Sequence, residues 1–343
     1  MRLRILPKEE IPRMVQALMA DYQVVGPKAK GPKFVFEPVA DPSEMRLDYN
    51  ITILSPKVVL QPPGERVATI RLEGKAPQVE PVVEVEPTVI FGAHTCDLHA
   101  IRLLDRAFSD EYPDGHYLER RRQTLIISVE CLEPCDEHSF CKDMGALTVD
   151  EGYDLHLTDI GEAYTVHVGT EAGEAVLERY AAARAATDAD VRRLNQVLSA
   201  KWPRFTHRLD FDAAELPAML ATAYEHPIWA ELGERCLACG SCTNICPTCY
   251  CFNVLDSIAL TQTEAVRTRR WDSCQLDEFA RVAGGENFRE ARAARQRHRF
   301  FRKGKYLYER FGTLGCVGCG RCIRTCLVHI NIVEVFNTIH SSA

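Results

Sequence analysis

Eight of the cysteines in this chain fall into two runs that share the same internal spacing. The runs are Cys236-x2-Cys239-x2-Cys242-x3-Cys246, followed by Pro247, and Cys316-x2-Cys319-x2-Cys322-x3-Cys326. Three closely spaced thiolates of this kind wrap an iron–sulfur cube, and in proteins with two runs the fourth cysteine of each run binds the other cube. The spacing therefore predicts two [4Fe-4S] clusters.

The exchange of fourth cysteines defines two expected groups of ligands. The first set is Cys236, Cys239, Cys242 and Cys326, and the second set is Cys316, Cys319, Cys322 and Cys246. Structural zinc is the alternative, but a zinc site uses four ligands in pairs, and eight thiolates at this spacing fit it poorly. Three glycines (Gly240, Gly318 and Gly320) allow the backbone to curl around a cluster and to point amide groups at its sulfurs.

Four more cysteines lie in the first half of the chain, and we call them the third set: Cys96, Cys131, Cys135 and Cys141. Cys96 and Cys131 each follow a short apolar segment, Thr88–Phe91 and Thr124–Val129 respectively, which we predict to be parallel strands. The carboxyl ends of parallel strands open on one edge of a sheet, where ligands bind in open α/β folds. We therefore expect a third [4Fe-4S] cluster at this edge.

Alternatives to a third cluster remain open at this stage. The four thiols are also compatible with a zinc site or with unligated loop cysteines. Each of three nearby histidines, His94, His99 and His138, is a candidate substitute ligand.

Three cysteines lie outside these sets. Cys249 and Cys251 follow the first run, and Cys274 lies in the string Trp271-Asp-Ser-Cys274. We expect them to pack near a cluster as small polarizable groups, with replacement of a ligand as the alternative.

Hydrophobic patterning divides the chain into two domains. Residues 1–210 are predicted to form an α+β or α/β domain, with further strands at Lys33–Val39 and Val67–Leu72. A helix begins after Gly92, with Asp97 as its expected N-cap, and it separates the two strands that precede Cys96 and Cys131. Residues 153–168 are predicted to form a hairpin, and two Ala-rich helices follow at 171–186 and 189–200.

Residues 211–343 are predicted to form a mainly helical, ferredoxin-like domain that contains both [4Fe-4S] motifs. The 69 residues between the two runs exceed the connection of a compact ferredoxin, which favours a wiring module inside a larger complex. Within this part, the segment 267–310 carries a net charge of +7. It is interpreted either as a solvated helical face or as a surface that docks an acidic partner or offsets the charge of a cluster.

Composition excludes several classes of function. A formal net charge of −7 argues against a nucleic-acid binder, and no apolar run approaches the roughly 18 residues of a membrane span. The start of the sequence is charged and does not resemble a signal peptide, so we expect a cytoplasmic protein, in which fifteen cysteines are better explained as ligands than as disulfides. Motifs for dinucleotides, nucleoside triphosphates and nucleophilic serines are missing, so we expect no flavin or nucleotide on this chain and no catalytic residue.

Beyond these motifs, the chain resembles the beta (iron–sulfur) subunits of sulfhydrogenases, the cytoplasmic NAD(P)-linked nickel–iron hydrogenases, and it is similar to the iron–sulfur subunits of anaerobic sulfite reductases. The strings that carry the resemblance are Val89–Leu98, Glu225–Trp229, Cys236–Cys251, Arg269–Gln275, Val282–Arg289 and Cys316–Cys322. Ser139 stands where the family commonly has the first cysteine of a Cys-Phe-Cys string, and Leu327 replaces the usual proline.

The resemblance implies an electron-transfer subunit. In such complexes a flavin-bearing, NAD(P)-binding gamma-type subunit exchanges hydride, and the beta subunit passes single electrons toward the small and large subunits of the nickel–iron hydrogenase. The alternative is the iron–sulfur subunit of an anaerobic sulfite reductase or of another flavin-dependent reductase.

Overall fold

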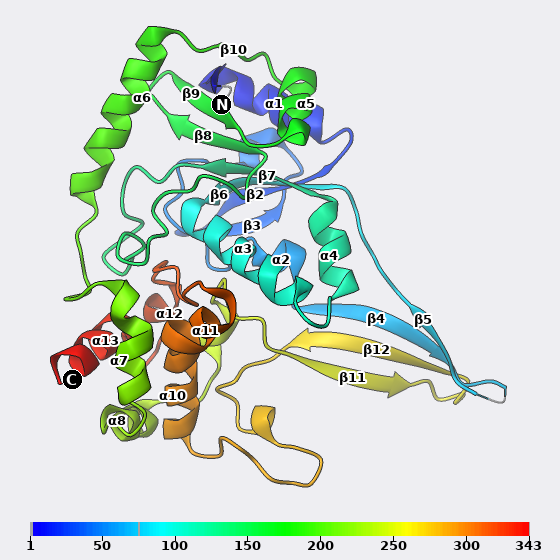
Figure 1. The fold of residues 1–343 in the computed structure, drawn as a ribbon. Helices are drawn as coiled ribbons and strands as arrows, with labels where there is room; N and C mark the ends of the chain where they lie inside the picture. The colour runs from blue at the N-terminus through cyan, green and yellow to red at the C-terminus, as the bar shows by residue number, and fades with distance from the viewer. Residues whose placement is uncertain (1–2, 75, 343) are drawn as a thin grey trace.

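The computed structural model describes residues 3–74 and 76–342, and its largest element is a mixed sheet of eight strands (Figure 1). In spatial order these strands are β10 (Arg184–Ala185), β1 (Leu3–Pro7), β9 (Ala163–Val168), β8 (Leu155–Asp159), β7 (Thr124–Val129), β6 (Thr88–His94), β2 (Gln23–Lys30) and β3 (Lys33–Pro38). The four strands β2, β6, β7 and β8 run parallel, and the outer pairings are antiparallel. Strand β6 is buried along its whole length, as expected for the middle of a covered parallel sheet.

Helices cover both faces of this sheet. Helices α1 (Ile11–Leu18) and α5 (Glu171–Tyr180) pack on one face, and α2 (Lys57–Leu60), α3 (Thr95–Ser109) and α4 (Gly115–Arg122) pack on the other. The prediction of a parallel strand–helix–strand unit is confirmed, because β6 pairs in parallel with β7 after a crossover through α3 and α4.

Local predictions in this half were mostly right. The hairpin of β8 and β9 is confirmed, with Gly161 in its turn. The first Ala-rich helix is shorter than expected: α5 ends at Tyr180, and β10 intervenes before α6 (Asp188–Lys201). Asp97 is not the N-cap of α3, because the helix begins at Thr95 and His94 takes that position; Asp97 lies in the first turn and is buried.

The second half contains short helices around its own apolar core. They are α7 (Leu216–Thr222), α8 (Ile228–Arg235), α9 (Ser241–Asn244), α10 (Arg292–Phe301), α11 (Leu307–Phe311), α12 (Arg321–Arg324) and α13 (Ile332–Ser341). A π-helical turn, Arg302–Tyr306, joins α10 to α11. The core includes Trp229, Phe300 and Phe336, and it also takes in Phe140 from the first half.

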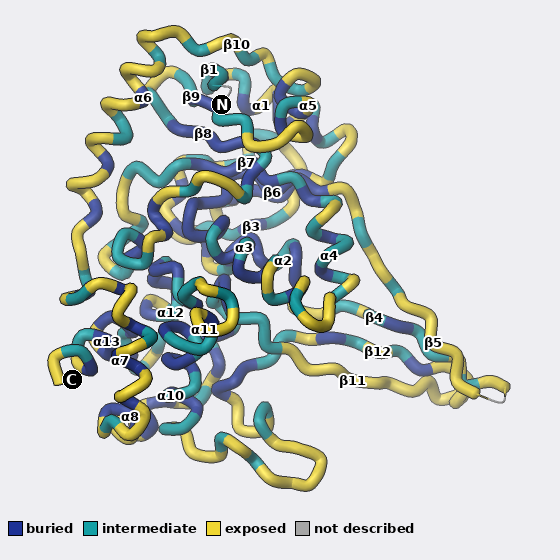
Figure 2. The backbone as a smooth tube through the Cα atoms, in the orientation of Figure 1, coloured by how far each residue is buried: buried dark blue, intermediate teal, exposed yellow. Residues whose placement is uncertain are grey.

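The expectation of a mainly helical second half needs one correction, because a hairpin lies between the two cysteine runs. Its strands, β11 (Phe252–Ile258) and β12 (Glu264–Trp271), join β4 (Gly64–Arg71) and β5 (Gln78–Pro81) in a four-stranded sheet ordered β11-β12-β4-β5. This sheet projects from the body of the molecule, and β11 is exposed along its length (Figures 1 and 2). Sequence patterning missed the pairing because its strands come from both halves of the chain.

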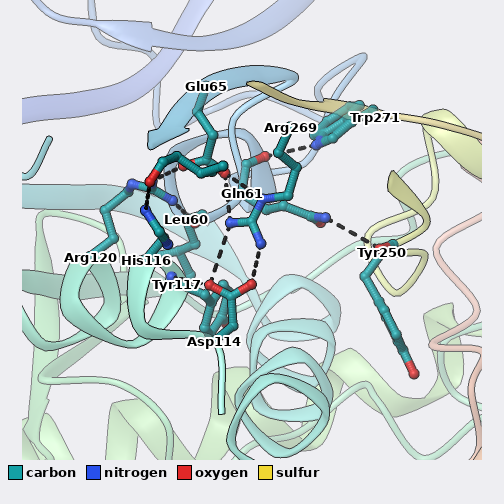
Figure 3. A network of polar contacts seen from close by, with 11 residues as sticks. Leu60, Gln61, Glu65, Asp114, His116, Tyr117, Arg120, Tyr250, Arg269 and Trp271 are labelled. Carbon is teal, nitrogen blue, oxygen red and sulfur yellow. Dashed lines mark hydrogen bonds and ion pairs between the residues drawn. The ribbon is translucent and has the colours of Figure 1, made fainter. Parts of the chain in front are cut away.

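A buried arginine secures the base of this sheet. Arg269 of β12 forms ion pairs with Glu65 of β4 and with Asp114, the N-cap of α4 (Figure 3). Arg120 of α4 pairs with the same Glu65. These ion pairs therefore hold the β11–β12 hairpin of the second half against the first half.

Among the described residues, no helix is both long enough and apolar enough to cross a membrane.

Candidate metal centres

The four thiols of the first set line one cavity, although Cys326 lies some eighty residues beyond the others in the sequence. Cys236 is buried, whereas Cys239 is exposed at the surface. Hydrogen bonding with the Ser241 hydroxyl lowers the pKa of Cys239, while burial raises the pKa of Cys242 to about 12. The structure thus brings together the four thiols that the exchange of fourth cysteines predicts as one set, and their ligation of a cluster stays a prediction.

Hydrogen-bond donors point at the sulfurs of this set. Gln296 Nε2 donates to Cys236 Sγ at 2.9 Å, and the backbone N–H of Ala238 donates to the same sulfur at 3.3 Å. The N–H of Ile330 donates to Cys326 Sγ at 3.3 Å. Donors to sulfur are among the means by which a protein holds an iron–sulfur cluster and adjusts its potential.

The thiols of the second set are also neighbours, as their mutual influence on ionisation shows. Burial raises the pKa of Cys319 to about 11, and nearby Cys246 and Cys322 add to that shift. Burial together with Cys322 and Cys319 likewise raises the pKa of Cys316. Cys246, from the first run, is therefore placed with three cysteines of the second run.

The two runs repeat the same backbone conformation. Gly240 and Gly320 have φ angles of 75° and 70°, and each is the N-cap of a short helix, α9 or α12. Two residues earlier in each run, Ala238 and Gly318 also have positive φ. Glycine is required at 318 for a further reason, since a Cβ there would lie 2.5 Å from the carbonyl oxygen of Phe140.

The third set gathers at the carboxyl edge of β6 and β7. Cys96 and Cys141 belong to one small group of buried apolar side chains, and Cys131 packs against this group. Burial, with contributions from Cys131 and Cys319, raises the pKa of Cys141 to about 12. Burial together with Cys131 and Cys141 raises the pKa of Cys135 well above its ordinary value, so all four thiols share one environment.

The second and third sets are in direct contact through their loops. The N–H of Phe140 donates to the carbonyl oxygen of Gly318 at 2.7 Å, and Cys319 packs on the group of side chains that contains Cys96 and Cys141. The first and second sets also approach one another, since Cys322 contributes to raising the pKa of Cys242. The three sets therefore form a succession in which the second lies between the other two.

Buried cations face these thiols, and they have no carboxylate partner within the part of the chain that the structure describes. Arg299 of α10 is 3% exposed, and although burial opposes its charge, Cys242 and Cys322 raise its pKa. Lys303, in the π-helical turn, donates to Thr248 Oγ1 at 2.6 Å, and Cys246 and Cys249 raise its pKa against the effect of burial. An unpaired buried cation costs several kcal/mol, so these two require a negative group beside them.

A third buried cation, Lys57 of α2, reaches the same region from the first half. Its ammonium donates to the carbonyl oxygens of Cys246 and Cys249 at 3.1 and 2.9 Å and lies 3.9 Å from the centre of the Trp271 ring. Burial lowers the pKa of Lys57 to about 8. Its bonds to these carbonyls tie the loop after the first run to α2.

The donor set fits iron–sulfur clusters. Thiols whose charged form is disfavoured by burial would become thiolates on binding iron, and the anionic centre that these cysteines would hold would compensate the buried cations. Within the described ranges, no three His, Cys, Asp or Glu side chains are arranged to hold a single metal ion.

The three cysteines outside the sets lie beside them. Cys249 is paired with Cys246 of the second set, and Cys251 is paired with Cys274. A hydrogen bond with Cys249 lowers the pKa of Cys246, and a hydrogen bond with Cys274 lowers the pKa of Cys251 to about 6. Gln275, the neighbour of buried Cys274, lines the cavity of the first set. The expectation that these cysteines pack near a cluster site agrees with this placement.

The three histidines near the third set differ in their surroundings. His99 Nε2 is bonded to the Thr148 carbonyl at 2.7 Å, and His138 lies 3.5 Å from Glu137. His94 is buried, stacks on Tyr49 with ring centres 4.1 Å apart, and lines a cavity of about 390 Å³ with Cys131 and Cys135. Substitution of a cysteine ligand by any one of these three histidines stays a prediction.

The basic segment 267–310 is not one helical face. It comprises most of β12, a loop, α10, the π-helical turn and most of α11, and several of its cations are buried. Arg295 is buried and bonded to Asp277 Oδ1 at 2.5 Å, so the solvated-face interpretation is wrong for this residue. Arg295, Arg299 and Lys303 recur at four-residue spacing, and this pattern was the signal in the sequence that could have identified the buried cations.

The fold and the grouped thiols define a protein that carries iron–sulfur clusters, and residues 235–330 match the family described as "4Fe-4S dicluster domain". That match spans all eight cysteines of the first and second sets, whereas the third set lies outside it.

The whole chain is similar to sulfhydrogenase 2 subunit beta of Pyrococcus furiosus, with 34% identity over 99% of this chain and 98% of the relative. The chain belongs to the sulfhydrogenase beta-subunit family and is an iron–sulfur electron-transfer subunit. No solved structure matches it.

Proposed function

We propose that this chain holds three [4Fe-4S] clusters, one in each set of thiols, and passes single electrons within a cytoplasmic, NAD(P)-linked nickel–iron hydrogenase complex. The expected partners are a flavin-bearing gamma-type subunit on one side and the small and large hydrogenase subunits on the other. The observation that carries this proposal is the succession of three thiol sets, in which the second set packs against the third and lies next to the first, through the neighbouring helices α12 and α9.

Both ends of this succession reach the protein surface. The first set ends at exposed Cys239, beside Leu237, which is also exposed. The third set ends at the cavity lined by Cys131 and Cys135. A chain that relays electrons needs two such ends, one facing the electron donor and one facing the electron acceptor.

The residues of the chain position and insulate the centres. Amide and glutamine donors orient the sulfurs, buried Arg299 and Lys303 balance their negative charge, and the apolar core around Phe300 excludes water. When bound, the clusters supply one-electron transfer. Hydride and hydrogen chemistry belong, on this proposal, to the partner subunits.

Metal analysis tests the number of centres. Three cubes predict about twelve irons with equal acid-labile sulfide per chain, against about eight for the two ferredoxin-type sets alone. Cys131→Ala should remove about four irons, and Cys239→Ser should degrade a different centre. Eight irons in the wild-type chain, or zinc in place of iron, would contradict the third site.

Electron flow tests the relay. In the assembled complex, Cys239→Ser should abolish hydrogen-linked reduction of NAD(P), while diaphorase activity of the flavin subunit with an artificial acceptor persists. An unchanged hydrogen-linked rate would contradict the relay. Copurification of sulfite reductase subunits in place of hydrogenase subunits would replace the proposed complex with the alternative one.

A further inference from the structure

One fully buried ion pair is located where the second and third sets meet. Arg321, on α12 between Cys319 and Cys322, is 0% exposed, and Asp97, directly after Cys96 on α3, is 1% exposed. The two guanidinium Nη atoms of Arg321 donate to the two carboxylate oxygens of Asp97 at 2.8 and 3.3 Å. The pair joins one residue from each half of the chain.

Thr52 satisfies the remaining face of this arginine. Arg321 Nε donates to the Thr52 carbonyl oxygen at 3.0 Å, and Nη2 donates to Thr52 Oγ1 at 3.2 Å. All three guanidinium nitrogens are therefore bonded, and the group has a fixed position. Fixed geometry of this kind requires the planar fork of arginine, which the single ammonium of lysine cannot reproduce.

The charge of Arg321 acts on both neighbouring sets. Although burial opposes this charge, Asp97 and the thiols of Cys319 and Cys96 raise the pKa of Arg321 well above its ordinary value. Asp97 is an unfavourable neighbour for the anionic form of Cys96, whose pKa is raised by burial and by this carboxylate. Arg321 lies in the second run between Cys319 and Cys322, and Asp97, to which it is bonded, directly follows Cys96 of the third set.

A pair of this kind is not explained by stability alone. Desolvation of two buried charges offsets most of their mutual attraction, and an apolar pair of similar volume is often as stable. An added electron makes an iron–sulfur centre more negative, so a fixed cation nearby favours the reduced form and a fixed anion disfavours it. In a water-excluded site such effects are weakly screened.

We propose that Arg321 and Asp97 form a positioning and tuning pair between the second and third clusters. Arg321 raises the reduction potentials of both clusters, and Asp97 lowers mainly that of the third. The pair also holds the Gly318–Cys319 loop against the loop of Phe140 and Cys141, across which an electron passes between the two halves. This inference rests on the proposed function, because it needs a cluster in each set.

The test is an EPR-monitored redox titration of the complete chain with its metal content verified. We expect Asp97→Asn, an isosteric change, to shift the potential of the third cluster upward. Arg321→Gln should shift the potentials of the second and third clusters downward, while Arg321→Lys, which keeps the charge, should shift them less. The first cluster, beyond the second set, should keep its potential in all three variants.

Arg324→Gln is the matched control. Arg324 lies on the same helix and pairs with Asp136, but its side chain is 32% exposed, so solvent screens its charge and little shift is expected. Potentials that stay unchanged in Asp97→Asn and Arg321→Gln, or that move in the same direction in both, would overturn the inference. A wild-type chain without a third cluster would instead contradict the proposed function, and iron analysis distinguishes that outcome.

Discussion

The two junctions between neighbouring thiol sets are built in different ways. Between the first and second sets, Arg299 faces Cys242 and Cys322 with no carboxylate partner among the described residues. Between the second and third sets, Arg321 is neutralised by Asp97 within the protein itself. Both arginines are buried, so the difference lies in where the compensating negative charge comes from.

This difference determines which junction depends on a bound cluster and which depends only on the charges of the folded protein. At the first junction the negative charge must come from thiolates and the bound centre, so the arginine favours the loaded state over the empty one. At the second junction the charges balance whether or not a centre is bound. The first junction is therefore expected to respond to loss of iron, and the second to loss of either charged residue.

The largest effect is expected from breaking the balanced pair. Arg321→Met should destabilise the chain by about 3–5 kcal/mol, because it strands Asp97 as a buried, uncompensated charge. Chemical denaturation measures this loss. The double variant Asp97→Leu/Arg321→Met should recover most of it, and a double variant no more stable than the single one would show that the pair is not an isolated electrostatic unit.

A smaller effect is expected at the junction between the first and second sets, and its sign should differ between the iron-loaded and the iron-free chain. Arg299→Met removes a charge-assisted contact worth about 1.5–3 kcal/mol, so iron release from the loaded chain to a chelator should quicken roughly tenfold or more. In the iron-free chain the same change should be neutral or stabilising, since it removes an uncompensated buried cation. Equal destabilisation of both forms would contradict the distinction between the junctions.

The smallest effect is expected at the partly exposed pair of Arg324 and Asp136, which also links the second run to the loop of the third set. Arg324→Ala should change the free energy of unfolding by only about 0–1 kcal/mol, because solvent screens the pair. High salt should remove what little there is. A loss as large as that of Arg321→Met would mean that the contact, and not burial, controls the junction.

Sequence spacing predicted the grouping of the thiols because it reflects local geometry. The curl of each run depends on residues two or three positions apart, and the strand–helix–strand pattern placed Cys96 and Cys131 at one edge of the sheet. Even the placement of Cys326 with the first run followed from the known exchange between runs.

What could not be predicted depends on contacts between distant segments. The sequence around Arg321 does not predict its ion pair with Asp97, because the two residues are 224 positions apart. Asp97 itself resembles an ordinary helix N-cap in the sequence. The four-stranded sheet was missed for the same reason, since β4 and β12 are paired across the two halves. The net charge of the segment 267–310 shows that it is basic but does not identify its buried cations, for which the four-residue spacing of Arg295, Arg299 and Lys303 is the local signal.

The central claim is that the second set lies between the other two, and EPR of the fully reduced chain tests it most directly. Neighbouring reduced centres couple magnetically, so the wild-type spectrum should show coupled spins. Removal of the second centre by Cys316→Ala/Cys322→Ala should leave two uncoupled signals, whereas removal of the third by Cys131→Ala should leave one coupled pair. Coupling that persists without the second centre would contradict the order deduced from the structure.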